Sequence, residues 1–212
     1  MYTTLLRFYL VSLIMAWTVS SLYAHPTREY GTLFEDSSLL ELTIEADFAA
    51  FLQDRGGRPS YHEATVQYKE GEETYAIPAE IRVRGRFRRD PLICDFPPVR
   101  LKFGKKQVLP ELFNGQRKLK LVTHCKDEKY IFREYYIYKV YQLLSVRSFR
   151  VRLARITYKD VNNAREAETR YAFIIESEQE LAQRTGGDPL DDDVSMHPGT
   201  VDKEGLTQVH MF

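Results

Sequence analysis

The chain has 212 residues, which is enough for one domain with a hydrophobic core. A hydrophobic content of 43% and an aromatic content of 13% indicate a globular protein. The 30 Lys and Arg residues balance 30 Asp and Glu residues, so no global positive field draws the protein to nucleic acid or to an anionic membrane. Any such binding has to come from a local patch.

Residues 1–24 have the pattern of a secretory signal peptide. Arg7 supplies the basic start, Phe8–Trp17 forms a short apolar run, and Ala24 is a suitable cleavage point. The apolar run is too short for a comfortable membrane span. We therefore expect an exported mature protein (periplasmic, cell-surface or extracellular) with no stable membrane span after cleavage. Leu22 is larger than the residue usual at its position, which leaves a retained anchor as the alternative.

The two cysteines, Cys94 and Cys125, both lie in the expected mature part. In an oxidising compartment an even pair predicts a disulfide, whereas in the cytosol both would be buried thiols. A bridge that closes a loop of this size stabilises by roughly 3 kcal/mol in the chain-entropy model. His124 lies beside Cys125, but two adjacent residues make a poor zinc site, so we expect no metal here.

The front half of the mature chain predicts a β-rich unit. A polar lead over residues 25–38 is followed by a strand at 39–46 and a short helix at 48–53, capped by Asp47. A hairpin then joins residues 64–68 to 74–77, Pro78 interrupts it, and the strand resumes at 80–84. A basic loop from Gly85 leads to the next strand at 99–103.

The second half is organised around a strand and a long helix. The strand at 117–122 alternates lysine with leucine, and an aromatic helix runs from about residue 127 to 144. Because apolar residues cover most of its circumference, we expect this helix to be largely buried against sheet. Strands at 149–158 and 169–176 follow as a hairpin, then a short helix at 178–184, an acidic loop at 188–193, and helical apolar spacing at 206–212.

The basic residues around the loop at 85–90 permit two interpretations. Backbone N–H groups and guanidinium groups suit phosphate oxygens, so a glycine-bearing basic loop between two strands is a possible phosphate cradle. Alternatively, the cations on the flanking strands solvate the outer face of a half-exposed sheet, and the sequence alone favours this second interpretation. These cations are Arg82, Arg84, Arg100 and Lys102.

Several short motifs, in this order, resemble the spore-coat protein H (CotH) kinase-like family. They lie at residues 40–44, 84–85, 100–103, 118–121, 133–135 and 152–158, within a stretch from Leu39 to Glu176. The segment at 118–121 is similar to a Lys-Leu-Asn-Leu strand of the family, with Lys120 in place of the asparagine. The resemblance covers only the amino-terminal part of that family.

The resemblance implies an α+β fold, a mainly antiparallel sheet with one long packed helix like the small lobe of a protein kinase. It implies ATP and Mg²⁺ or Mn²⁺ as cofactors and a protein side chain as phosphate acceptor. Lys118 or Lys120 would hold the phosphates and pair with Glu134, with Lys102 as a rival for the lysine role. The loop that begins with Gly85 and Arg86 would cover the phosphates.

The chain departs from the family where the chemistry would lie. The aspartates of the catalytic loop and the metal site have no counterpart, so we expect no phosphoryl transfer by this chain alone. The expected organisation is a small lobe over 39–185, then an acidic loop and the start of an interrupted large-lobe helix over 186–212. The abrupt apolar end favours truncation over a naturally short protein.

A second function class also fits the sequence. A non-catalytic exported binding or envelope module would use the basic sheet face to hold anionic cell-surface polymers. Nucleic-acid binding is disfavoured, because the net charge is zero and residues 1–24 predict export.

Overall fold

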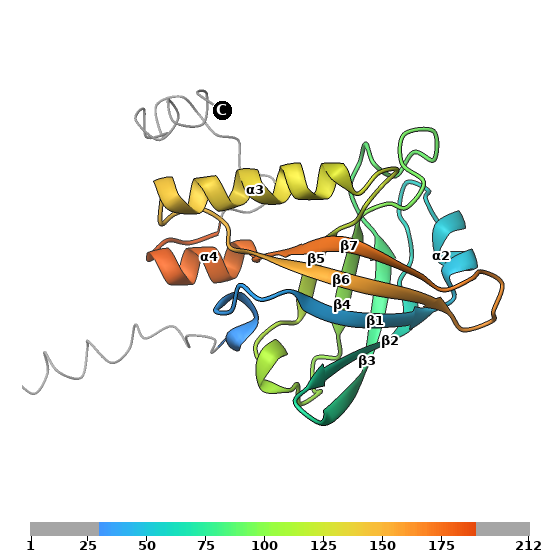
Figure 1. Cartoon of the computed structure of the whole chain (residues 1–212), viewed down its shortest axis with the longest axis horizontal. Helices are drawn as coiled ribbons and strands as arrows, with labels where there is room; N and C mark the ends of the chain where they lie inside the picture. Colours follow the sequence, from blue (N-terminus) through green and yellow to red (C-terminus); the bar gives the residue numbers. More distant parts are fainter. Residues whose placement is uncertain (1–29, 190–212) are drawn as a thin grey trace, which may run out of the picture.

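The computed structural model describes residues 30–189 (Figure 1). The expected signal peptide, most of the acidic loop and the apolar pattern at 206–212 lie outside these residues. The strands are β1 (Leu40–Ala46), β2 (His62–Glu70), β3 (Glu73–Val83), β4 (Val99–Phe103), β5 (Lys118–Val122), β6 (Val151–Asp160) and β7 (Glu168–Ile175). The helices are α2 (Phe48–Gln53), α3 (Lys129–Leu144) and α4 (Glu178–Thr185), with 3₁₀ turns η2 (Thr32–Phe34) and η3 (Glu111–Phe113).

The strands form a closed barrel in the order β1-β2-β3-β4-β5-β7-β6. Neighbouring strands pair antiparallel except where β1 meets β6. That parallel pair aligns Leu40 with Ala154 and Ala46 with Asp160, and it closes the sheet on itself. Closure removes the two exposed edges that an open sheet of this length would leave.

The barrel interior follows from the period-two alternation of the strands. In β4, Val99, Leu101 and Phe103 are buried while the two residues between them are half-buried. The same alternation places Leu119 and Leu121 of β5 inside and its lysines outside. The inward side chains of all seven strands form one contiguous apolar core, which η2 and η3 extend with Leu33 and other buried side chains.

The expected α+β small lobe was wrong, because the sheet is a closed barrel. The strands themselves lie close to their predicted positions. The sequence analysis did not predict the partners of β1, which pairs with both β2 and β6 and so closes the sheet. Residues that pair across β1 and β6 are 114 positions apart, and no local pattern signals such a partner.

The expected burial of the long helix was also wrong. α3 lies along the outside of the barrel over β6 and β7 (Figure 1). Only Ile131 and Tyr135 of its sixteen residues are buried, in a small second core with Phe173 and other outward residues of β5, β6 and β7. Because the helix is apolar around most of its circumference, we expected sheet to cover it on every side. The barrel covers only one side of it.

Pro78, expected to interrupt a strand, lies inside a continuous β3 and opposite Thr65 of β2. On the other side of β3, pairing with β4 ends one residue away, at Ala79. Pro78 has no backbone N–H to donate, so the sheet loses an inter-strand hydrogen bond to at most one neighbouring strand. This explains why the proline is tolerated.

Candidate anion-binding site

The outer face of β3, β4 and β5 carries a row of cations. The strand register sets Arg82 opposite Arg100 and Arg100 opposite Lys120, so three cations lie side by side across three strands. A second row sets Lys102 opposite Lys118. Neighbouring strands are only about 4.8 Å apart, and like charges at that spacing repel one another. We call Arg82, Arg84, Arg100 and Lys120 the basic cluster.

The arginines of the basic cluster have no carboxylate partner. Among residues 30–189, none of Arg82, Arg84 and Arg100 has a carboxylate within ion-pair distance. Burial, together with the nearby positive charge of Arg100, lowers the pKa of Arg84. The Nε atom of Arg100 is itself buried without a hydrogen-bond partner. An anion placed between these guanidinium groups would offset their crowded positive charge.

The carboxylates that border the basic cluster are already engaged. Glu178, at the start of α4, accepts a hydrogen bond from Lys120, and Glu80 pairs with Lys102. Burial opposes the ionisation of Glu178, but the bond from Lys120 and the charges around it hold its pKa below the ordinary value. Glu178 therefore stays ionised and neutralises only part of the surrounding positive charge.

An aromatic ring supports one edge of this face. The guanidinium of Arg82 lies 4.6 Å and the ammonium of Lys102 lies 4.7 Å from the centre of the Tyr61 ring. Such contacts fix the long side chains through cation–π attraction without reducing their charge. Arg82 is held in place at this edge and remains available to an anion, whereas Lys102 is already paired with Glu80.

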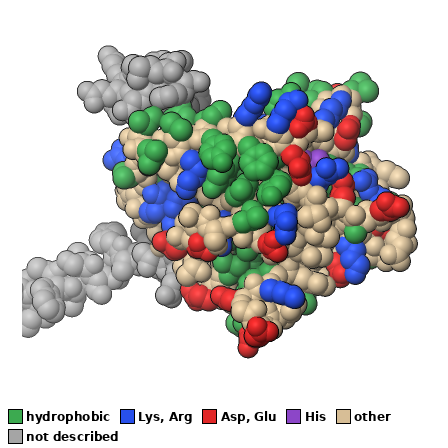
Figure 2. All heavy atoms as spheres, viewed as in Figure 1, with side chains coloured by type: hydrophobic (Ala, Val, Ile, Leu, Met, Phe, Trp, Pro, Cys, Tyr) green, Lys and Arg blue, Asp and Glu red, His purple; other side chains and the backbone are tan. Residues whose placement is uncertain are grey.

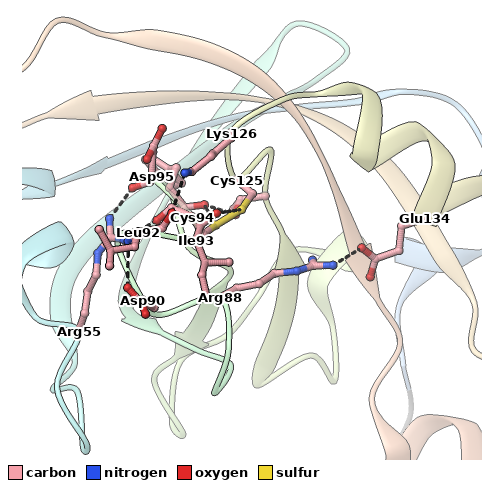
Figure 3. The surroundings of a disulfide bond; sticks show 12 residues. Arg55, Arg88, Asp90, Leu92, Ile93, Cys94, Asp95, Cys125, Lys126 and Glu134 are labelled. Carbon is pink, nitrogen blue, oxygen red and sulfur yellow. Dashed lines mark hydrogen bonds and ion pairs between the residues drawn. A yellow bond between two sulfur atoms is a disulfide. The ribbon is translucent and has the colours of Figure 1, made fainter.

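The loop between β3 and β4 is fixed to the rest of the molecule at several points (Figure 3). The expected disulfide Cys94–Cys125 is confirmed, with the two Cα atoms 4.7 Å apart. Beside it, Nη1 of Arg55 donates to the Cys94 carbonyl at 2.6 Å and Nζ of Lys126 donates to the Leu92 carbonyl at 2.7 Å. A loop fixed in this way holds its arginines in defined positions.

Glu134 does not pair with a strand lysine. Its carboxylate accepts a hydrogen bond from Nη2 of Arg88 at 2.8 Å, which joins the β3–β4 loop to α3 (Figure 3). The lysines expected to meet it have other environments: Lys120 bonds Glu178, Lys102 bonds Glu80, and Lys118 is exposed. The expected lysine–glutamate pair is thus absent, because the β3–β4 loop supplies an arginine to Glu134.

The residues expected to cover phosphates lie at the turn after β3. Gly85 has φ +89°, a left-handed backbone that favours glycine, and Arg86 is exposed. Arg89 donates instead to the carbonyls of Gly56 and Gly57, at 2.7 and 3.1 Å. The backbone at Gly85 and the side chain of Arg86 therefore remain available at the rim of the basic cluster.

The metal implied by the family resemblance finds no suitable ligands among the described residues. No group of three His, Cys, Asp or Glu side chains there could hold a metal ion. The acidic side chains at the site, Glu80, Glu134 and Glu178, are each bonded to a cation of the protein. No step of a mechanism is therefore assigned to Mg²⁺ or Mn²⁺.

The comparisons with known proteins leave the chain without an assigned family. No protein-family profile matches it, and no curated protein matches it significantly. Within residues 30–189, no helix has the length and apolar content needed to cross a membrane.

Sequence reasoning found the cations of the site but not their surroundings. Arg84 and Arg100 were expected merely to solvate the sheet, and their mutual crowding follows from the β3–β4 register and from burial at the end of β3. The roles of Glu178 and Arg88 were missed. The sequence marks Glu178 only as an acidic residue in the first turn of a helix. That position does not predict which strand lies next to the helix.

Proposed function

We propose that this chain is a non-catalytic exported binding domain that holds an anionic polymer on the outer face of β3, β4 and β5. The observation that supports the proposal is the pair Arg84 and Arg100, two crowded guanidinium groups without a carboxylate partner. Guanidinium groups bind phosphate, sulfate and carboxylate groups with paired hydrogen bonds. A row of cations across neighbouring strands suits a repeating chain of charges better than a single enclosed ligand.

Charge reversal at the two crowded arginines should abolish polymer binding. We expect Arg84→Glu and Arg100→Glu each to weaken binding of polyphosphate by tenfold or more, since they place a like charge against the ligand. The measurement is isothermal titration with polyphosphate at two salt concentrations. Arg170→Glu makes the same charge change on β7 and should leave the affinity within twofold.

This proposal fails if the two site variants bind polyphosphate as tightly as the unmodified protein does. It also fails if Arg170→Glu weakens binding to the same degree, because the effect would then reflect overall charge. Circular dichroism spectra of all three variants check that the barrel is intact.

A second candidate is that the chain is the nucleotide-binding part of a CotH-like kinase. It rests on the motifs at residues 100–103 and 118–121, which bring Arg100 and Lys120 opposite each other on β4 and β5. Under this proposal the basic cluster receives the phosphates of ATP. Phosphoryl transfer would still need the aspartates that this chain lacks.

A thermal-shift titration separates the two candidates. A nucleotide site predicts that ATP with Mg²⁺ raises the melting temperature with ligand concentration, by an amount equivalent to about 2.7 kcal/mol at a hundredfold excess over Kd. The polymer-binding proposal predicts a rise with polyphosphate that is much larger than the rise with ATP at the same concentration of phosphate groups. A rise with ATP that Arg100→Glu removes would favour the nucleotide site over the polymer site.

A further inference from the structure

The side of α3 that faces away from the barrel is apolar. It exposes Tyr136, Ile137, Val140, Leu143 and Leu144, each at least half accessible and Leu143 at 87%. Figure 2 shows hydrophobic side chains gathered along this part of the surface, with Lys and Arg side chains beside them. Contiguous exposed apolar side chains on a soluble domain mark a contact with a partner or a membrane.

The exposed side follows from the geometry of the helix. Successive residues turn by about 100°, so Val140 points almost directly away from the buried pair Ile131 and Tyr135. A helix that lay on its own barrel and faced only water would carry polar residues there. In α3 that side carries Val140, Ile137 and Leu144 together with two cations, Arg133 and Lys129. The outer side is therefore a surface of apolar side chains with positive charges among them.

Positive charge around this apolar face exceeds what the nearby carboxylates neutralise. Residues 127–147 hold four cations, Lys129, Arg133, Lys139 and Arg147, and three carboxylates, Asp127, Glu128 and Glu134. Asp127 pairs with Lys129, Glu134 pairs with Arg88, and Glu128 accepts a hydrogen bond from the backbone N–H of Tyr171. Among the described residues, Arg133, Lys139 and Arg147 have no ion-pair partner. The chain as a whole is neutral, so this is a local concentration of positive charge. A partner that covers the face must be apolar at its centre and negative at its rim.

We propose that the outer face of α3 docks on an anionic phospholipid bilayer. Apolar side chains would enter the boundary between headgroups and acyl chains while the lysines and arginines meet the lipid phosphates. Tyr130 and Tyr136, both exposed, suit the headgroup level, where tyrosine is enriched. The helix lies on the membrane surface and does not cross it. This site is separate from the basic cluster.

A second copy of the chain fits this face less well. In an antiparallel pair of α3 helices centred on Val140, Arg133 of one copy would meet the segment after Leu144 of the other, which carries Arg147. A parallel pair sets each cation against itself. Both arrangements bring like charges together beside an apolar contact, which costs binding energy. A bilayer that contains acidic lipids supplies the opposite charge, worth about 1 kcal/mol for each Lys or Arg near its surface.

Vesicle sedimentation tests the proposal. The mature protein is mixed with vesicles of pure phosphatidylcholine or of equal parts phosphatidylcholine and phosphatidylglycerol. We expect at least tenfold stronger partitioning to the vesicles that contain phosphatidylglycerol, and loss of the difference at high salt. Ile137→Asp and Leu144→Asp should each reduce partitioning at least tenfold. Both positions are exposed, so the barrel should stay folded.

The control is Val108→Asp, which makes the same kind of change at a side chain that is 93% exposed in the loop between β4 and β5. It should partition like the unmodified protein. Equal binding to both vesicle types, or unchanged binding of Ile137→Asp, would overturn the proposal. So would light scattering that finds a dimer which Ile137→Asp converts to a monomer, because the face would then belong to a second copy.

Discussion

Replacing Glu176 with alanine is expected to lower the free energy of unfolding by about 3–5 kcal/mol. The Glu176 side chain is completely buried and follows β7 directly. Its carboxylate accepts from the backbone N–H and Nε of Arg150, both at 2.9 Å, and from Nε and Nη2 of Arg184, at 3.1 and 2.9 Å. Its removal leaves two arginines without their shared counter-charge.

The loss should also loosen α4. Arg184, in the last turn of that helix, donates further to the carbonyls of Val146 and Ser148, at 2.7 and 2.8 Å. Arg150 donates to Glu180 of α4 at 2.7 Å. Glu176 thus binds together the end of β7, the start of β6 and α4. Since α4 carries Glu178 to the basic cluster, the substitution should disturb the candidate site as well.

Urea denaturation of the purified variants measures this effect. Glu176→Gln keeps the volume and one acceptor oxygen, so it should lose less stability than Glu176→Ala and remain measurable if the alanine variant does not fold. Glu41→Ala removes the carboxylate of a surface pair with Arg155 and should change stability by less than about 1 kcal/mol. A loss below 1 kcal/mol in Glu176→Ala would show that the network contributes little.

The strand positions were predictable because the alternation that defines each strand lies within its own sequence. β4 and β5 alternate buried apolar residues with cations, and the period of two assigns each side chain to a face without knowledge of the neighbouring strands. Barrel closure was not predictable in this way. The partner of β1 in the parallel pair depends on how far the sheet coils, which the sequence of β1 does not encode.

The helix α3 shows a second limit of the sequence. Its apolar circumference predicted burial on all sides, yet Val140 and Leu143 are exposed in the isolated chain. The apolar circumference indicates that every side of the helix avoids water, but it does not predict what each side contacts instead. Only the side with Ile131 and Tyr135 is buried, and the other side is the basis of the proposed membrane contact.

The candidate site was predictable in its cations and not in their partners. The alternation of β3 to β5 gathers Arg82, Arg100 and Lys120 on one face, and this much could be read from the chain. Which carboxylate meets which cation depends on the positions of α3, α4 and the β3–β4 loop. Those positions assign Glu134 to Arg88 and Glu178 to Lys120, although sequence spacing favours neither choice.

Removing the disulfide is expected to lower the free energy of unfolding by about 3–4 kcal/mol, the chain-entropy value for cysteines separated by 31 residues. Cys94→Ser with Cys125→Ser leaves each position with a side chain of similar size. The bridge lies where the β3–β4 loop meets the segment after β5, and Phe96 bonds to the Cys125 carbonyl there at 3.2 Å. The double variant should melt at a markedly lower temperature in calorimetry.

The same change should weaken the anion site by more than the loss of stability explains. Arg84 and Arg88 flank the turn at Gly85, and the bridge is one of the contacts that hold their loop against the barrel. At a temperature where the double variant is still folded, we expect its affinity for polyphosphate to fall several-fold. Dithiothreitol should reproduce both effects in the unmodified protein and have none on the double variant. Unchanged affinity in a folded double variant would mean that the remaining contacts of the loop, those of Arg55, Lys126 and Arg89, suffice to position its arginines.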